Sequence, residues 1–278
     1  MSKHSKSGAV RGFGGKPIAN ICPFTSQGKP ETTKKVLMRS LTCLFLMLAF
    51  AGNAKAEEMV NIGSFEIDRT EVTIGAFREF IDATNTTTSA EIAGGGEVYE
   101  SGWVQKPGWT WRTPFGLPAL DTEPAVHVTF EEASAYCGWR GKRLPTDAEW
   151  VEAAYTERRI SPPAPFEPGV TYPYPTGKSP EGANCLEGCG ASPAIDVSAV
   201  LRRGTGHAPA GTTRPGVNGL YDMGANVWEW TENGAGGQKT TRGGSWWYGP
   251  RQMHRDHIAT KPAGTAVVYI GFRCARSF

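Results

Sequence analysis

Residues 219–230 read GLYDMGANVWEW, and RGGSW follows at residues 242–246. The last four residues of the first stretch are typical of a short strand, and further short strands are predicted over residues 240–248 and 267–274. The chain has 35 Gly and 20 Pro among its 278 residues, which is high for an architecture of long regular elements. We therefore expect an irregular α+β fold in which ordered loops predominate.

Helices are predicted upstream of this stretch. Thr73 precedes apolar residues at helical spacing, so we expect it to cap a helix that begins at Ile74. Two later segments, which begin at Thr129 and Thr146, have the S/T-x-x-E pattern of a capping box. Residues 84–122 are polar and glycine-rich, contain three Trp and show no periodicity. They are predicted to form a long loop, and such loops are often functional.

The first 56 residues have the pattern of an export leader. Basic residues precede an apolar run over residues 41–51, and the small residues of an A-x-A-like cleavage site follow. The run is shorter than the ~20 residues that a membrane-spanning helix needs. We predict a leader and signal peptide over residues 1–56, with Met38 as an alternative start, and one domain over residues 57–278. The mature protein is expected to be periplasmic or secreted, with no membrane span.

Charge separates the leader from the rest of the chain. Of 29 Lys and Arg and 27 Asp and Glu, nine basic residues and one acid lie in residues 1–56. The other 20 basic and 26 acidic residues give a net charge of −6. This balance does not favour binding to nucleic acid or to an anionic membrane. We expect a monomer with no nucleic-acid partner.

Four cysteines follow the leader: Cys137, Cys185, Cys189 and Cys274. An even number in an oxidising compartment indicates two disulfides, for which three pairings are possible. Cys185 and Cys189 are close enough in sequence for a local bridge, which would leave Cys137 for Cys274. The alternative is a zinc site, but the Cys-x3-Cys pair has no clear second half, and His207 is a poor complement.

Five motifs occur in an order that indicates a family. They are PAVHVT (124–129), CGWRGKRLPTDAEW (137–150), GLYDMGANVWEW (219–230), RGGSW (242–246) and GFRC (271–274). Over roughly residues 59–278 the chain resembles the formylglycine-generating enzyme, or sulfatase-modifying factor, domain family. The resemblance implies a compact, loop-rich relative of the C-type lectin fold. It also implies a disulfide between Cys137 and Cys274.

Active members of this family resemble copper oxidases. The resemblance implies that two cysteines after Gly-Gly-Ser hold Cu(I), activate O2 and oxidise a sulfatase cysteine to formylglycine. Soft thiolates suit Cu(I). In this chain Tyr248 and Met253 occupy the two positions, and neither side chain is a thiol. We therefore expect a divergent member that does not generate formylglycine, and copper is not an expected cofactor.

Structural calcium is the cofactor that the resemblance implies. It assigns one Ca2+ to the side chains of Asp222 and Glu229 and the carbonyls of Ala225 and Val227, and such oxygen ligands suit a hard cation. The alternative is that Asp222 caps a turn and Glu229 makes an ion pair. A second predicted site combines three residues: Asn184, the carbonyl of Cys185, and Asp196.

The family's substrate groove is predicted to be aromatic and cationic in this chain. Its pocket residues are Arg143, Trp228, Trp246, Trp247 and Arg255. The hypothesis for reactive groups names Ser245, Tyr248 and His257. Aromatic walls with a few polar groups are typical of ligand sites. The alternative is that Trp228 and Trp246 are core residues and that the histidines lie on the surface.

Two classes of function fit these features. The first is a divergent periplasmic oxidase that acts on a small or peptidic substrate, similar to the pyoverdine-maturation branch of the family. The ergothioneine branch fits less well, because its additional His-rich helical domain for iron is not present in this sequence. The second is a non-catalytic, calcium-stabilised, lectin-like binding module. The sequence does not decide whether the chain is an enzyme.

Overall fold

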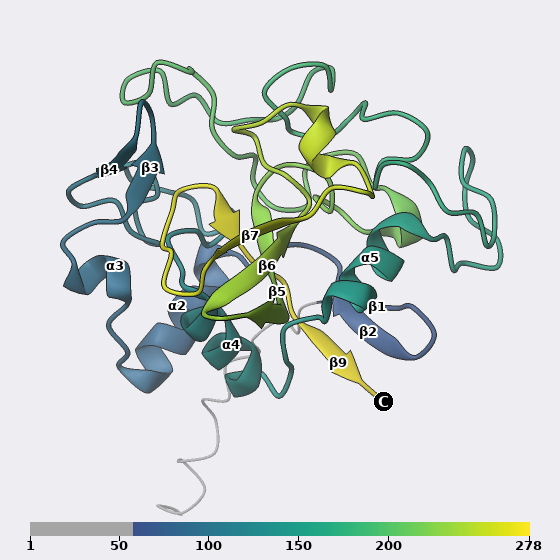
Figure 1. The fold of residues 1–278 in the computed structure, drawn as a ribbon, viewed down its shortest axis with the longest axis horizontal. Helices are drawn as coiled ribbons and strands as arrows, with labels where there is room; N and C mark the ends of the chain where they lie inside the picture. Colours follow the sequence, from purple (N-terminus) through teal and green to yellow (C-terminus); the bar gives the residue numbers. More distant parts are fainter. Residues whose placement is uncertain (1–57) are drawn as a thin grey trace, which may run out of the picture. The chain divides into compact units, whose positions relative to one another are not determined.

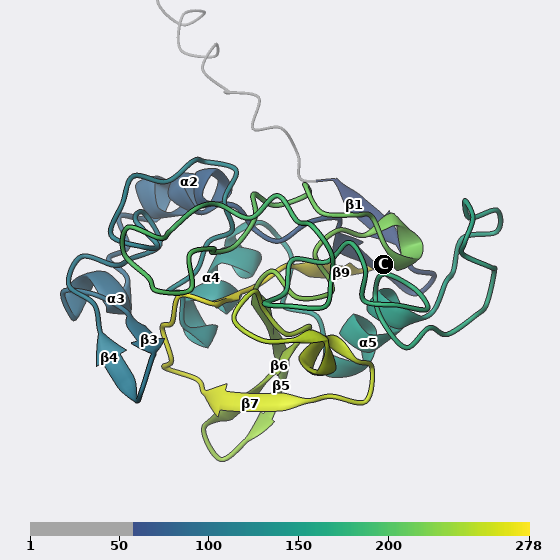
Figure 2. The ribbon, with the colours of Figure 1, turned by 90° about the horizontal axis from the view of Figure 1, so that it is seen from above.

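The computed structural model describes residues 58–278, so the predicted leader and signal peptide over residues 1–56, with Met38, lies outside the described residues. The described part combines short helices and small sheets joined by long loops, which confirms the expected α+β class (Figures 1 and 2). The helical elements are α2 (Ile74–Thr84), α3 (Ser89–Ile92), α4 (Phe130–Trp139), α5 (Asp147–Tyr155), and the 3-10 turns η1 (Val217–Gly219) and η2 (Pro250–Met253). None of the helices in this part is long and apolar enough to cross a membrane.

The strands form three small sheets. One sheet has the order β1-β2-β9, a hairpin pairs β3 with β4, and a third sheet has the order β7-β6-β5-β8. The strands are β1 (Met59–Asn61), β2 (Phe65–Asp68), β3 (Glu97–Tyr99), β4 (Trp103–Gln105), β5 (Trp228–Ala235), β6 (Gln238–Arg242), β7 (Ala259–Pro262), β8 (Ile270–Gly271) and β9 (Ala275–Ser277). The first and last strands therefore lie in one sheet, on either side of β2.

The predicted helices and their caps are present. Thr73 precedes α2 and its hydroxyl oxygen accepts from the backbone N–H of Ala76 at 3.2 Å. Thr129 and Thr146 form complete capping boxes at the starts of α4 and α5. The apolar face of α2 is buried in the main core, where Phe77 packs against aromatic rings that include Trp111 of the 84–122 segment.

Three predictions about strands and loops were wrong. The strand expected over residues 240–248 ends at Arg242, because Gly243 and Gly244 have φ of +94° and +78°, which turn the chain out of the sheet. The 84–122 segment is not wholly irregular, since it contains α3 and the β3–β4 hairpin. The strand predicted over residues 267–274 is also shorter, because only Ile270–Gly271 forms a strand within it and Val267 makes an isolated bridge to Glu97.

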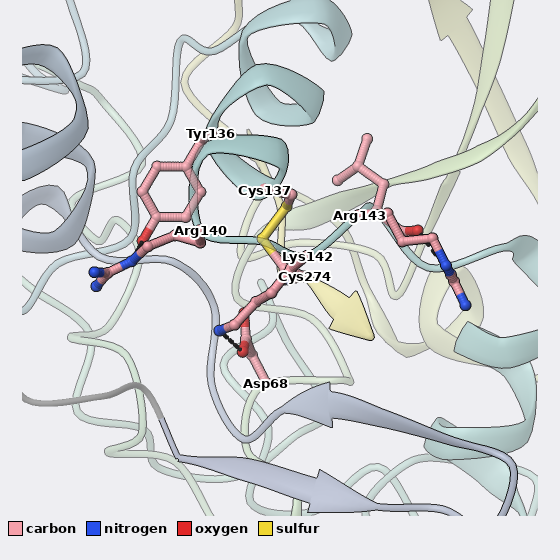
Figure 3. The surroundings of a disulfide bond; sticks show 8 residues. Asp68, Tyr136, Cys137, Arg140, Lys142, Arg143 and Cys274 are labelled. Carbon is pink, nitrogen blue, oxygen red and sulfur yellow. Dashed lines mark hydrogen bonds and ion pairs between the residues drawn. A yellow bond between two sulfur atoms is a disulfide. The ribbon is translucent and has the colours of Figure 1, made fainter. Parts of the chain in front are cut away.

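Two disulfides are present, Cys137–Cys274 and Cys185–Cys189, as predicted. The first is fully buried and joins α4 to the segment before β9 (Figure 3). Asp68 lies beside it and accepts from the Lys142 ammonium at 2.5 Å and from the backbone N–H of Cys274 at 2.9 Å. We call this group, Asp68, Cys137, Lys142 and Cys274, the C-terminal corner. It fixes α4 against the end of the chain.

Candidate functional site

The residues after Gly244 line an aromatic site. Trp246 and Trp247 are buried, and Tyr248 is half-buried. Ring centroids lie 5.0 Å apart for Trp246 and Trp247, and 5.6 Å apart for Trp247 and Tyr269. The ring centroids of Tyr248 and Tyr269 lie 5.8 Å apart. Burial and the neighbouring Tyr248 hydroxyl raise the pKa of Tyr269, so Tyr269 is a neutral phenol at physiological pH.

Trp228, the first residue of β5, extends this site. Its ring lies 5.9 Å from Tyr248 and 5.7 Å from His257. The indole N–H groups of Trp228 and Trp246 are buried and have no acceptor within the described protein. Buried donors are nearly always satisfied in folded proteins. Both rings belong to the main hydrophobic core, as the alternative for Trp228 and Trp246 expected, so a water or a ligand group would have to enter the interior to reach these donors.

His257 contributes the titratable group of the aromatic site. It follows η2 and is half-buried. Burial lowers the pKa of His257, and the positive charges of Arg251, Arg242 and Lys261 lower it further. A small pocket of about 200 Å³ is lined by Arg251, His254, Asp256 and His257. The imidazole is therefore neutral at pH 7 and lies on a mainly cationic rim.

Ser245 is buried in this arrangement. It is 1% exposed, and its hydroxyl oxygen accepts from the backbone N–H of Trp247 at 3.3 Å. The hydroxyl stabilises the turn that places Trp247. The assignment of Ser245 as a catalytic group stays a prediction.

Arg143 is engaged by Glu149 and Ser277, and its assignment to the substrate pocket stays a prediction. Its guanidinium binds both carboxylate oxygens of Glu149 at 2.6 and 2.7 Å and donates to Ser277 at 2.6 Å. Figure 3 shows it beside the C-terminal corner. Arg255 is exposed, and its nearest ion pair is with Asp256 at 3.5 Å. It belongs to the outer rim near His257 and not to the aromatic floor.

The Cys185–Cys189 loop packs directly against the aromatic site. The backbone N–H of Leu186 donates to the carbonyl of Tyr248 at 3.0 Å. Met253 is fully buried, in an apolar cluster that also contains Cys189 and, at its edge, Cys185. The small disulfide ring therefore holds the segment that follows Tyr248.

A buried acidic cluster lies behind the aromatic site. It consists of Glu71, Asp222, Glu229 and Arg273. Arg273 binds both oxygens of Glu229 at 2.7 Å, and Trp150 donates to the same carboxylate at 2.7 Å. The cluster thus contains three carboxylates and one guanidinium, which is hydrogen-bonded to Glu229 alone among them. If all are ionised, the cluster carries two uncompensated negative charges in the interior, which is costly.

The pKa values of this cluster reflect that imbalance. Burial and the charges of Asp222 and Glu229 raise the pKa of Glu71 well above its ordinary value. Burial also raises the pKa of Asp222, although its oxygens accept from Thr213 at 2.5 Å and from the N–H of Gly211 at 2.6 Å. The cluster must therefore take up protons or gain a cation.

The comparisons with known proteins agree with this geometry. Residues 27–278 match the description "Sulfatase-modifying factor enzyme 1-like domain". The chain belongs to the sulfatase-modifying factor family. It is 30% identical over 262 residues to the formylglycine-generating enzyme of Thermomonospora curvata, covering 78% of this chain and 83% of that protein.

Other members of the family include proteins without this activity. The chain is 33% identical to the "Inactive C-alpha-formylglycine-generating enzyme 2" of Mus musculus, covering 81% of this chain and 79% of that protein. It is 36% identical to the hercynine oxygenase of Mycobacterium tuberculosis over 169 residues, which cover 50% of this chain and 37% of that protein. The structure of PvdO from Pseudomonas aeruginosa aligns with a TM-score of 0.51 at 20% identity, covering 77% of this chain and 80% of that one. The fold is the loop-rich, C-type-lectin-like fold expected of the family.

The copper positions of the sulfatase-modifying factor family contain no thiol in this member. Tyr248 presents a half-buried phenol at the first, and Met253 a fully buried thioether at the second. The four cysteines of the described part are all in disulfides. These residues do not fit a site that needs two thiolates for Cu(I).

The first calcium position has the two predicted acids, but both already have protein partners. Asp222 accepts from Thr213 and Gly211, and Glu229 is bound by Arg273 and Trp150, as in the alternative of a turn cap and an ion pair. Asp222, Ala225 and the following Asn226 have positive φ of 60°, 61° and 52°, so the backbone curls tightly between the two predicted acidic ligands. A divalent cation would balance the two surplus charges of the acidic cluster, and carboxylate and carbonyl oxygens are the ligands that Ca2+ prefers. The assignment of Asp222, Ala225, Val227 and Glu229 stays a prediction.

The residues of the second calcium position also have protein partners. Asp196 is exposed, and its carboxylate accepts from the N–H of Ser198 in its own turn at 2.9 Å. Asn184 is buried, where its amide donates to Asn226 and Gly206 and its oxygen accepts from Ser192. The assignment of Asn184, Cys185 and Asp196 to one cation stays a prediction, and in this structure the acid and the amide have separate local partners.

Sequence reasoning missed several residues of the site. Glu71, Arg273 and Tyr269 are far apart in sequence from the motif around Trp228, so their contacts could not be read from spacing. One signal was available for Arg273, which lies in the apolar run VVYIGFRCA over residues 267–275, whereas Glu71 lies in the polar stretch DRTEVT over residues 68–73. A charged residue in an apolar run is usually paired in the interior.

Proposed function

We propose that this chain is an exported member of the sulfatase-modifying factor family that binds a ligand at its aromatic site and does not generate formylglycine. The observation that carries the proposal is the loss of both thiols at Tyr248 and Met253. Formylglycine generation by copper requires thiolates there, and the cysteines of the described part are committed to disulfides. The likeness to a relative named as inactive supports the same conclusion.

The binding role is supported by what remains at the site. The aromatic site keeps an apolar floor, two buried indole donors, a neutral imidazole and a cationic rim. Such a mixture can bind and orient a small or peptidic ligand. In this proposal the protein acts as a monomer on such a ligand, with no nucleic-acid partner.

Calcium has a structural role in this proposal. Asp222 and Glu229, with the carbonyls of Ala225 and Val227, would hold the ion, which supplies charge compensation to the acidic cluster. The two disulfides support export to an oxidising compartment, and the periplasm or the exterior is therefore the proposed location.

A divergent oxidase is the second candidate, favoured by the likeness to hercynine oxygenase over half of the chain. Oxidation of a bound substrate would need a redox centre. Among residues 58–278, no three His, Cys, Asp or Glu side chains are placed together to hold a metal ion. This candidate therefore has less support from the site than ligand binding has.

The decisive experiment is a peptide-oxidation assay. The purified mature chain, with and without added Cu(I), is incubated in air with a sulfatase-derived cysteine peptide, and peptide mass is followed. We expect no conversion of the cysteine. A Tyr248→Cys/Met253→Cys double variant is the matched comparison and should gain Cu(I) binding in a colorimetric competition. Formation of the aldehyde by the unmodified chain would overturn the proposal.

A further inference from the structure

A second pocket opens on the other side of Trp247. Its volume is about 450 Å³. One wall is the tip of the β3–β4 hairpin, with Glu100 and Ser101, and the other is the loop that carries Leu201 to Arg203. The hairpin lies on the side of the domain opposite α5 in both views (Figures 1 and 2). Trp247 is thus shared by the aromatic site and this pocket, which we call the Arg203 pocket.

Arg203 is held in a fixed position in this pocket. Its guanidinium lies 4.0 Å from the centroid of the Trp247 ring, and its Nη1 donates to the Trp247 carbonyl at 3.0 Å. Stacking on an indole and a hydrogen bond orient the planar group. Because Nη1 is used by the carbonyl, the remaining N–H groups of the fork are directed elsewhere.

The charge of Arg203 is not neutralised within the described protein. Neither Arg203 nor the adjacent Arg202 forms an ion pair with a carboxylate among residues 58–278. The acid that lines the pocket, Glu100, is paired with Lys106 at 3.0 Å. The pocket therefore offers an oriented guanidinium whose planar fork matches a carboxylate.

Exposed aromatic rings lie on the hairpin whose tip lines this pocket. Tyr99 and Trp103 are 45% and 50% exposed, although both are large and apolar. They pair across the hairpin with ring centroids 5.4 Å apart, and they flank Glu100 and Ser101 in sequence. Tyr99 also lies near Tyr269, whose ring stacks on Trp247. Exposed aromatics beside a pocket are typical of a binding surface.

We propose that the Arg203 pocket binds a carboxylate joined to a planar aromatic body. Arg203 binds the carboxylate, and the rings of Tyr99 and Trp103 cover the aromatic body. The inference rests on the proposed role of the protein in ligand binding, and it names the class of ligand. None of the pocket residues lies within the five family motifs. Trp247 directly follows one of them, RGGSW over residues 242–246.

The test uses two probes that differ only in charge: 4-fluorophenylacetate and 4-fluorophenylacetamide. Binding to the mature protein is followed by the 19F line width, since the protein contains no fluorine. We expect the carboxylate to bind about fivefold more tightly than the amide, as is typical of a solvent-exposed ion pair. Arg203→Gln should remove this preference for the carboxylate. Trp103→Ala should weaken the binding of both probes by the same factor.

Two control variants make the test specific. Arg202→Gln removes the same charge at the neighbouring position, and Arg158→Gln removes it in a distant pocket lined by Glu152 and Phe65. Both should keep most of the preference for the carboxylate. Equal losses in Arg202→Gln and Arg203→Gln, or no binding of either probe at the highest soluble concentration, would overturn the assignment. The peptide-oxidation assay does not depend on this pocket, so the two proposals can fail separately.

Discussion

The two disulfides of the described part differ in the length of chain they close and in what they hold in place. Cys137–Cys274 spans 137 positions and is fully buried in the C-terminal corner, whereas Cys185–Cys189 spans four and lies against the aromatic site. In the chain-entropy model the first contributes ~5 kcal/mol to stability and the second ~2 kcal/mol. The long bridge therefore stabilises the C-terminal corner, whereas the short bridge stabilises the loop that packs against the aromatic site.

The largest effect on stability is expected at the C-terminal corner. A Cys137→Ala/Cys274→Ala double variant should lose ~4–5 kcal/mol in the free energy of unfolding, because the unfolded chain gains the entropy of a long open loop. Urea denaturation followed by Trp fluorescence measures the loss. A loss below about 1 kcal/mol would show that Asp68, Lys142 and the packing of α4 hold the corner without the bridge.

Calcium is expected to have the next largest effect, through the acidic cluster that lies between the two regions. If Ca2+ binds at Asp222 and Glu229, a concentration ~100-fold above Kd should stabilise the protein by about 3 kcal/mol. Thermal unfolding after EDTA treatment, with and without added Ca2+, measures this shift. Identical melting temperatures in the two samples would rule out the site.

The same cluster predicts a dependence on pH. The raised folded-state pKa values of Glu71 and Asp222 favour the protonated carboxyls. Their contribution is present below the ordinary carboxyl pKa and is lost as pH rises through the folded value. Metal-free protein should therefore become less stable as pH rises above the ordinary carboxyl range, and Ca2+ should reduce this loss. Asp222→Asn is the matched control, which should flatten the profile and remove the calcium effect.

The smallest effect on stability is expected at the short bridge. A Cys185→Ala/Cys189→Ala double variant should lose ~2 kcal/mol or less. Its stronger effect should be on the aromatic site, because Leu186 is hydrogen-bonded to Tyr248. Hydrogen exchange of the segment around Tyr248 should rise, while that of α4 stays unchanged. Equal increases in both regions would contradict the division described above.

The helices and their caps could be predicted from the sequence, whereas much of the candidate site could not. The caps at Thr129 and Thr146 are local signals, since both partners lie within four residues. The bidentate pair of Arg143 with Glu149 could not be predicted, because the position of Arg143 in a family motif says nothing about its side-chain partner. The end of β6 depends on the φ angles of Gly243 and Gly244, which a pattern of apolar residues does not reveal.

The three-stranded sheet has a consequence for how the chain becomes folded. Strand β2 pairs with β1 on one side and with β9, almost the last residues of the chain, on the other. One edge of β2 therefore stays unpaired until residues 275–277 have been made and have reached it. Such a dependence on a partner far away in the sequence slows folding.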